Sequence, residues 1–183
     1  MKTALLVKGG PLILENSDKF YRDIHEDVGI MTKVASAQGY NLISVVPLDQ
    51  MFDEITRMSS PDDFLFYFVG HANSKVLGRR NYPFEKFFGE VDKNYSGRKL
   101  IVLDCCTQDL LNREDINFPF NSRVCSAYKV YSKPSLAKLF HDGVFSWRKD
   151  LEQIDVNFFE DQKHYWVKVR DTSLTTLGDN GNG

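Results

Sequence analysis

The sequence has no excess of charge of either sign. Its 23 lysine and arginine residues stand against 25 aspartate and glutamate residues, which leaves a formal net charge of -2 over 183 residues. Proteins that attract nucleic acid or an anionic membrane surface over long range carry a marked positive charge. We therefore expect neither a nucleic-acid partner nor a membrane partner.

Long apolar runs are also lacking near the start of the chain. The first ten residues, MKTALLVKGG, contain one early lysine and an apolar run that extends only from Thr3 to Val7. Such a run is too short for the core of a signal peptide and far too short to cross a bilayer. We expect a cytoplasmic protein.

Cysteine is scarce. Cys105 and Cys106 are adjacent and Cys125 stands alone, a spacing that fits neither a disulfide framework nor a CxxC metal pattern. Three histidines have no cysteine or acid at metal-ligand spacing, and we interpret them, like Cys125, as structural or solvated: His25, His141 and His164. The sequence therefore predicts free thiols, no metal site and no cofactor.

The sequence does contain an alternation of short apolar runs with segments of helical period, which is typical of βα units on a parallel sheet. We predict an α/β fold of three α-β-α layers with a mostly parallel sheet of about six strands. Strands are expected at Thr3–Val7, Tyr40–Val46, Phe64–Val69, Lys99–Asp104 and Arg123–Tyr128, with a last edge strand within 164–170. No linker divides the chain, so we predict one domain over residues 1–175 and a disordered tail at 176–183.

Helices are expected between these strands. Apolar residues recur at steps of three and four over 21–38, and Gly39 follows where a helix C-cap glycine belongs. Shorter apolar stripes predict helices over 48–58 and 83–95, and two further segments, 135–140 and 144–154, suggest helical cover after the fifth strand.

Two polar stretches directly follow the third and fourth strands, at Ala72–Asn81 and Thr107–Ser122. In an open parallel sheet such loops lie at the carboxyl edge, where these folds place their sites. If the two strands are neighbours, roughly 4.8 Å apart, then His71 and the Cys105-Cys106 pair meet at this edge. A cysteine and a histidine together can carry out nucleophilic attack on a carbonyl.

Structural interpretations of the same residues remain open at this point. Two small buried residues can simply end the core strand LIVLDCC, and a lone histidine at a strand end is more often solvated than catalytic. Successive side chains point to opposite sides of a strand, so Cys105 and Cys106 cannot both face one cleft, but the pleat does not say which does.

The segments FLFYFVGHA and KLIVLDCCTQD resemble the two strand-end motifs of the caspase and metacaspase family, which hold the catalytic histidine and cysteine. The flanking segments HEDVGIMTKVASAQGYNLI and GVFSWRKDLEQ are similar to two of the family's helices. The resemblance covers about residues 3–153. It implies a caspase-like fold and a thiol endopeptidase whose partner is a peptide or protein substrate.

The resemblance also implies residue roles. His71 would be the catalytic histidine and Cys106 the nucleophile, with the backbone amides of Ala72 and Cys106 binding the oxyanion. Asp27 and Asp104 match the aspartates that line the pocket for the residue before the cut bond, which implies cleavage after Arg or Lys. Taken singly, Asp104 can instead cap a helix or loop, and Asp27 can be a first-turn acid that the helix dipole favours.

The sequence departs from the family pattern in two places. Ala72 replaces the glycine after the histidine, and Gln108 stands where a glycine usually follows the nucleophile by two. Activity could therefore be weak or lost, and the alternative function is a catalytically inactive caspase-like interaction module. A third interpretation uses Gly9 and Gly10 for a flavodoxin-like phosphate or nucleotide site, although no GxGxxG or P-loop spacing follows them.

Overall fold

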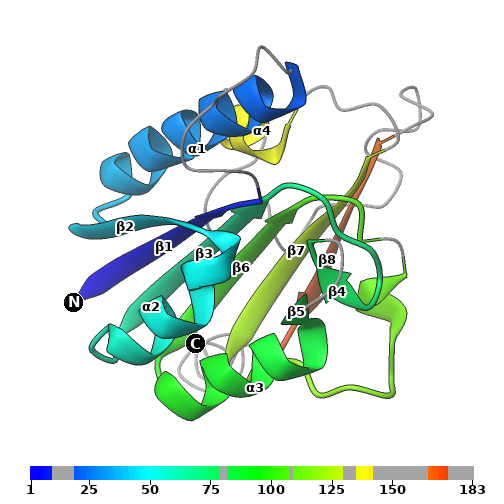
Figure 1. The fold of residues 1–183 in the computed structure, drawn as a ribbon. Coiled ribbons are helices and arrows are strands. Elements are labelled where there is room, and N and C mark those ends of the chain that lie inside the picture. Colours follow the sequence, from blue (N-terminus) through cyan, green and yellow to red (C-terminus); the bar gives the residue numbers. More distant parts are fainter. Residues whose placement is uncertain (10–18, 79–81, 108, 130–134, 142–164, 173–183) are drawn as a thin grey trace, which may run out of the picture.

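The computed structural model describes residues 1–9, 19–78, 82–107, 109–129, 135–141 and 165–172. They form a six-stranded sheet of order β2-β1-β3-β6-β7-β8, in which β8 alone runs antiparallel to its neighbour (Figure 1). Its strands are β1 (Lys2–Lys8), β2 (Leu42–Pro47), β3 (Asp63–Val69), β6 (Arg98–Asp104), β7 (Ser122–Lys129) and β8 (Tyr165–Asp171). The predicted α/β class and mostly parallel sheet are confirmed.

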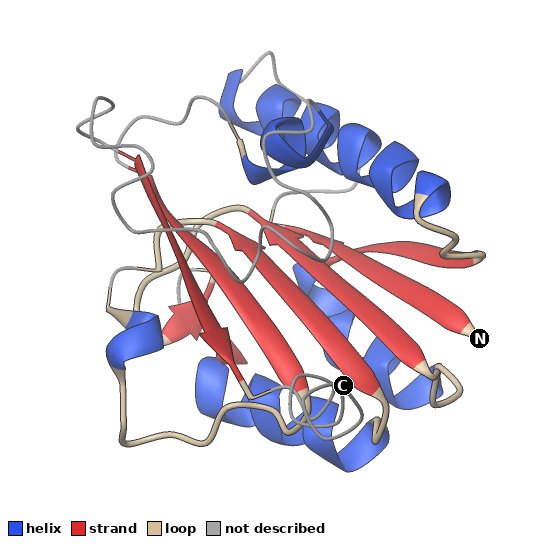
Figure 2. Cartoon of the chain, turned by 180° about the vertical axis from the view of Figure 1, so that it is seen from behind, coloured by secondary structure: helices blue, strands red, loops and turns tan. Residues whose placement is uncertain are grey.

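Helices cover both faces of the sheet, giving three layers (Figure 1, and Figure 2 from behind). One face carries α1 (Lys19–Ala37) and α4 (Leu136–His141), and the other carries α2 (Met51–Arg57) and α3 (Phe84–Asn94). No described helix has the length and apolar content needed to cross a membrane. The helix predicted over 144–154 and the tail at 176–183 lie outside the described residues.

Strand β3 shows why the sheet is central. Its residues are buried from Phe64 to Val69, with one set of side chains packed toward α1 and α4 and the alternate set toward α2 and α3. Complete burial of a large apolar side chain contributes about 1.5 to 3 kcal/mol. Burial on both faces explains why β3 is a nearly all-apolar run, as is typical of central strands in parallel sheets.

The predicted cap glycine of α1 adopts the expected conformation. Gly39 has φ +85°, and the amide of Tyr40 donates to the carbonyl of Ala35 at 3.1 Å, while the Gly39 amide donates to Ser36 at 3.0 Å. This is a Schellman motif, which satisfies the last carbonyls of the helix. It turns the chain sharply into β2.

The segment predicted as a loop at Ala72–Asn81 contains more structure than expected. It includes the short strand β4 (Val76–Leu77), which pairs with β5 (Tyr82–Pro83) as a two-stranded antiparallel sheet. Strands of two residues are too short to leave a period in the sequence. The 3₁₀ turn η2 (Leu110–Asn112) was missed because it is equally short, whereas η1 (Leu48–Gln50) forms the start of the helix predicted over 48–58.

Candidate active site at the carboxyl edge of the sheet

The two predicted reactive residues lie at the ends of neighbouring strands. β3 pairs in parallel with β6, and Val69 is the register partner of Asp104. His71 follows Val69 by two residues, and Cys106 follows Asp104 by two. The predicted adjacency of these strand ends is therefore confirmed, and it lies at the carboxyl edge that α/β proteins use for their sites.

A tight turn presents Cys106 to solvent. The Thr107 amide donates to the Cys105 carbonyl at 3.0 Å, which puts Cys106 at the centre of a three-residue turn. Cys106 is exposed, whereas Cys105 is 1% exposed and packs in the core beneath α3. Burial also raises the pKa of the Cys125 thiol inside β7. Cys106 is consequently the accessible thiol of the three.

The loop that carries His71 is folded back on itself. The Gly78 amide donates to the His71 carbonyl at 2.7 Å, and the Asn73 amide donates to Val76 at 3.1 Å. The Asn73 side-chain oxygen accepts the amides of Lys75 and Val76, at 2.8 and 2.9 Å. These bonds hold the backbone of His71 in one place while its side chain stays exposed.

Arg113 connects this loop to the one that follows Cys106. Its Nη1 donates to the carbonyl of Ser74 at 3.0 Å, and its guanidinium pairs with Asp115 at 2.7 Å. Arg170 of β8 in turn donates to the carbonyls of Leu111 and Arg113, at 3.0 and 2.9 Å. The two loops that bear His71 and Cys106 are therefore fastened to each other.

The backbone amide of Ala72 remains available as a donor. Ala72 forms an antiparallel bridge with Leu77, but the two hydrogen bonds of this bridge come from the flanking residues Asn73 and Gly78. Among the described residues, the Ala72 amide donates to no acceptor. Within the described part of the chain, alanine at this position thus keeps an N–H donor of the kind that an oxyanion site requires.

Two glycines bring the ends of β1 and β3 close together. A Cβ on Gly70 would lie 2.7 Å from the Cα of Gly9, and a Cβ on Gly9 would lie 2.8 Å from the Cα of Gly70. The Gly9 amide also donates to the Val69 carbonyl at 2.8 Å. Gly9 therefore has a packing role next to His71, beyond the turn that its sequence suggested.

The two predicted pocket aspartates gather around the start of α4. Ser135 donates its hydroxyl to Asp27 at 2.7 Å, and Asp104 accepts the hydroxyl of Tyr67 at 2.8 Å and the amide of Ala137 at 3.4 Å. Both aspartates are buried: Asp27 is 5% exposed and Asp104 is 1% exposed. Residues separated by 77 positions thus converge on one helix start.

The interpretation of Asp27 as a first-turn acid is wrong, because α1 begins at Lys19 and has no acid in its first turn. The capping interpretation of Asp104 is closer to the structure, since its carboxylate accepts an amide of the first turn of α4. Ser135 acts as the direct N-cap, accepting the Lys138 amide at 3.2 Å.

The sequence interpretation missed a polar contact at the same edge. Lys8, the last residue of β1, is 8% exposed, and its Nζ lies 3.4 Å from Nδ1 of His25. Burial lowers the pKa of Lys8, and burial together with the Lys8 charge lowers the pKa of His25. The signal in the sequence was Lys8, which directly follows the apolar run Ala4–Val7. It favoured an exposed side chain, since an unpaired lysine is rarely buried.

Gln108 stands where the family pattern has a glycine after the nucleophile, and the next residue, Asp109, has a backbone conformation typical of glycine. Asp109 adopts φ +63°, the left-handed conformation that glycine accepts most easily. Aspartate is one of the few other residues that tolerate it.

In the described part of the chain, no three His, Cys, Asp or Glu residues are placed to hold a metal ion.

Together these features define an α/β protein of three layers with a cysteine and a histidine at adjoining strand ends. Sequence comparisons add no family assignment, because no protein-family model and no curated protein sequence matches the chain.

Proposed function

We propose that this protein is a cysteine endopeptidase of the caspase and metacaspase type, with a Cys106–His71 dyad. The observation that carries the proposal is the register of β3 and β6, which puts the accessible thiol and the histidine at adjoining strand ends. The resemblance of the two strand-end motifs to the family supports the same assignment.

In the proposed reaction the Cys106 sulfur attacks the carbonyl carbon of the scissile peptide bond, and His71 accepts the thiol proton. The amides of Ala72 and Cys106 donate to the oxyanion that forms. The bond to nitrogen breaks as His71 protonates the leaving amine, which leaves a thioester on Cys106. Water, deprotonated by His71, then releases the acid and restores the thiol.

The proposal includes a preference for Arg or Lys before the cut bond. Its support is the resemblance together with the shared location of Asp27 and Asp104, which concentrates two carboxylates at one point near the carboxyl edge. A guanidinium or ammonium group that reaches this point gains charge-assisted hydrogen bonds, whereas an acidic side chain is repelled.

The test is the reactivity of Cys106. Iodoacetamide treatment of the native protein, followed by peptide mass spectrometry, should label Cys106 and leave Cys105 and Cys125 unmodified because both are buried. The variant His71→Ala should lower the labelling rate by about tenfold or more, since the base that assists thiolate formation is lost. His141→Ala, which removes another exposed histidine, should leave the rate unchanged.

Peptide cleavage tests the reaction itself. Fluorogenic peptides with Arg or Lys before the bond should be cut, and those with Asp should not. Cleavage that persists in Cys106→Ala would sink the assignment. An intact protein whose Cys106 reacts at the same rate with and without His71 would instead be the catalytically inactive interaction module.

A further inference from the structure

A cavity of about 400 Å³ lies at the amino-terminal edge of the sheet. It is formed by the first residues of β1 and β2 and by the end of α2 with the two residues that follow. Cavities of roughly 300 to 1,000 Å³ accommodate small organic ligands. Cys106 and His71 are at the carboxyl edge, so this cavity belongs to the other end of the strands.

Part of the cavity wall is apolar and exposed. Met1 and Leu42 line the cavity and are 47% and 51% exposed. Among the described residues these are two of the four large hydrophobic residues that are exposed. Ile43 and Met58 extend the same wall. A ligand with an apolar body would remove this surface from water, which is favourable in proportion to the area covered.

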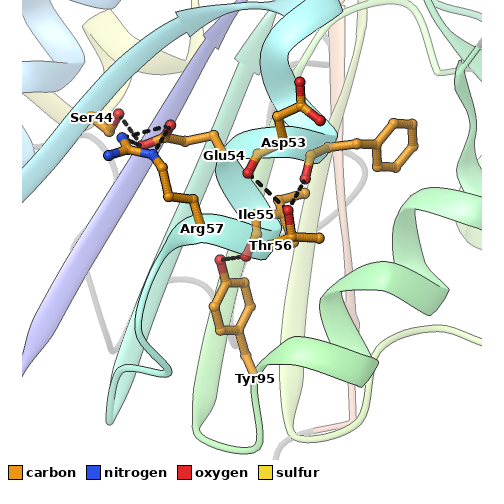
Figure 3. A network of polar contacts seen from close by, with 8 residues as sticks. Ser44, Asp53, Glu54, Ile55, Thr56, Arg57 and Tyr95 are labelled. Carbon is orange, nitrogen blue, oxygen red and sulfur yellow. Dashed lines mark hydrogen bonds and ion pairs between the residues drawn. The ribbon is translucent and has the colours of Figure 1, made fainter.

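The cavity also contains an ion pair whose carboxylate is fully used (Figure 3). Ser44 donates to Oε1 of Glu54 at 2.8 Å, and Arg57 donates to the two carboxylate oxygens through Nε and Nη2, at 2.6 to 3.1 Å. These four bonds match the roughly four acceptor positions of a carboxylate. Hydrogen bonding from Arg57 keeps the pKa of Glu54 low, so the carboxylate stays charged.

Two residues that line the cavity, Arg57 and Thr3, each have a side-chain donor without an acceptor among the described residues. The Arg57 side chain is 74% exposed, and its Nη1 has no acceptor among the described residues. Thr3 is 2% exposed, and its buried hydroxyl has no hydrogen-bond partner in the described part of the chain. Buried polar atoms are nearly always hydrogen-bonded in folded proteins. The acceptor positions of the Glu54 carboxylate are already used by Ser44 and Arg57. A ligand that complements the remaining groups of the cavity therefore supplies acceptors rather than donors.

We propose that this cavity binds a small organic carboxylate with a compact apolar body. The carboxylate accepts from Nη1 of Arg57 and from the Thr3 hydroxyl, and the apolar body covers Leu42 and Met58. The inference does not depend on the proposed peptidase activity, because none of its residues belongs to that site.

The test compares two probes that differ only in the head group, 4-phenylbutanoate with a charged carboxylate and 4-phenylbutanamide with a neutral amide. Calorimetric titration of the full chain should show binding of the carboxylate, with the amide about tenfold weaker or more because a charge-assisted bond is lost. In ¹⁵N amide spectra the carboxylate should shift signals of residues 42–44 and 57–59. No binding, equal binding of both probes, or shifts confined to other residues would overturn the proposal.

Three variants test whether Arg57 and Thr3 bind the carboxylate of the probe. Arg57→Gln should weaken carboxylate binding by about tenfold without changing that of the amide, and Thr3→Val should weaken it by about three- to tenfold. Thr3→Val keeps the side-chain shape and removes a hydroxyl that has no partner in the described structure, so it should fold even if Arg57→Gln does not. Thr56→Val is the matched control, because the Thr56 hydroxyl bonds to carbonyls of its own helix (Figure 3). Wild-type affinity in Thr3→Val would contradict the proposal.

Discussion

At the residue scale, the contact between Gly9 and Gly70 sets how closely the ends of β1 and β3 approach. Gly70→Ala should destabilise the protein by about 1 to 3 kcal/mol, because a Cβ would lie 2.7 Å from backbone that cannot easily move. It should also slow the labelling of Cys106, since His71 follows directly. Urea unfolding and iodoacetamide labelling measure the two effects.

The control for this substitution is Gly29→Ala. A Cβ on Gly29 meets nothing within 4 Å, and the residue lies inside α1. Alanine is the better helix former, so this variant should gain about 0.5 to 1 kcal/mol. A Gly70→Ala protein as stable as the wild type would show that the two strand ends can separate without cost.

The two adjacent cysteines differ in their exposure to solvent. The turn closed by Thr107 exposes Cys106 and leaves Cys105 in the core. The sequence predicted that one of them alone would face a cleft, and the resemblance selected Cys106. The pleat alone could not make the choice, because it depends on where the strand ends and the turn begins.

At the element scale, Glu54 fastens α2 to β2 through Ser44 and carries its own ion pair with Arg57. The hydrogen bonds from Arg57 lower the pKa of Glu54 in the folded protein. A carboxyl group with a lowered folded pKa stabilises the protein above its unfolded pKa, about 4.3, and loses this contribution as the pH falls through the folded value.

Glu54→Gln should therefore lower the urea midpoint at pH 7, and the difference from the wild type should shrink on going to pH 3. Midpoints measured across this range check the sign. Glu114→Gln, at an exposed glutamate, should give the same midpoint as the wild type at each pH. A Glu54→Gln difference that is equal at both ends of the range would contradict the assigned ionisation.

The start of α4 shows what an element-level pattern can miss. The sequence predicted helical cover over 135–140, and α4 lies there, but its contacts with Asp27 and Asp104 join three separate parts of the chain. Asp27 and Asp104 are 77 positions apart in the sequence, and no local sequence pattern predicts that they meet. The resemblance implies that both aspartates line one pocket, and that role stays a prediction; the structure shows that both carboxylates contact residues at the start of α4.

At the scale of the whole molecule, the sheet separates two candidate sites. The Cys106 and His71 loops follow the carboxyl ends of β3 and β6, whereas the cavity lined by Thr3 and Arg57 lies at the amino ends of β1 and β2. Effects of substitutions at distant sites without shared partners are usually additive.

Thr3→Val should therefore leave the rate of Cys106 labelling within about twofold of the wild type. The same iodoacetamide assay, with His71→Ala as the reference for a damaged site, provides the measurement. A Thr3→Val rate as low as that of His71→Ala would mean that the two ends of the sheet are coupled.

The sequence by itself determined the fold class, the six long strands and the four described helices to within a few residues. Apolar periodicity is local, and a short, aromatic-rich apolar run such as FLFYFV is typical of a strand that is covered on both faces. It also indicated the carboxyl edge as the place for a site, because the polar stretches follow two consecutive predicted strands.

Only the tertiary structure decided which groups meet. The register of β3 and β6, the exposure of Cys106, the Gly9–Gly70 contact and the cavity beside Thr3 all join segments that are distant in sequence or depend on a single turn. Such contacts follow from how whole elements pack, and no periodicity within one segment encodes them.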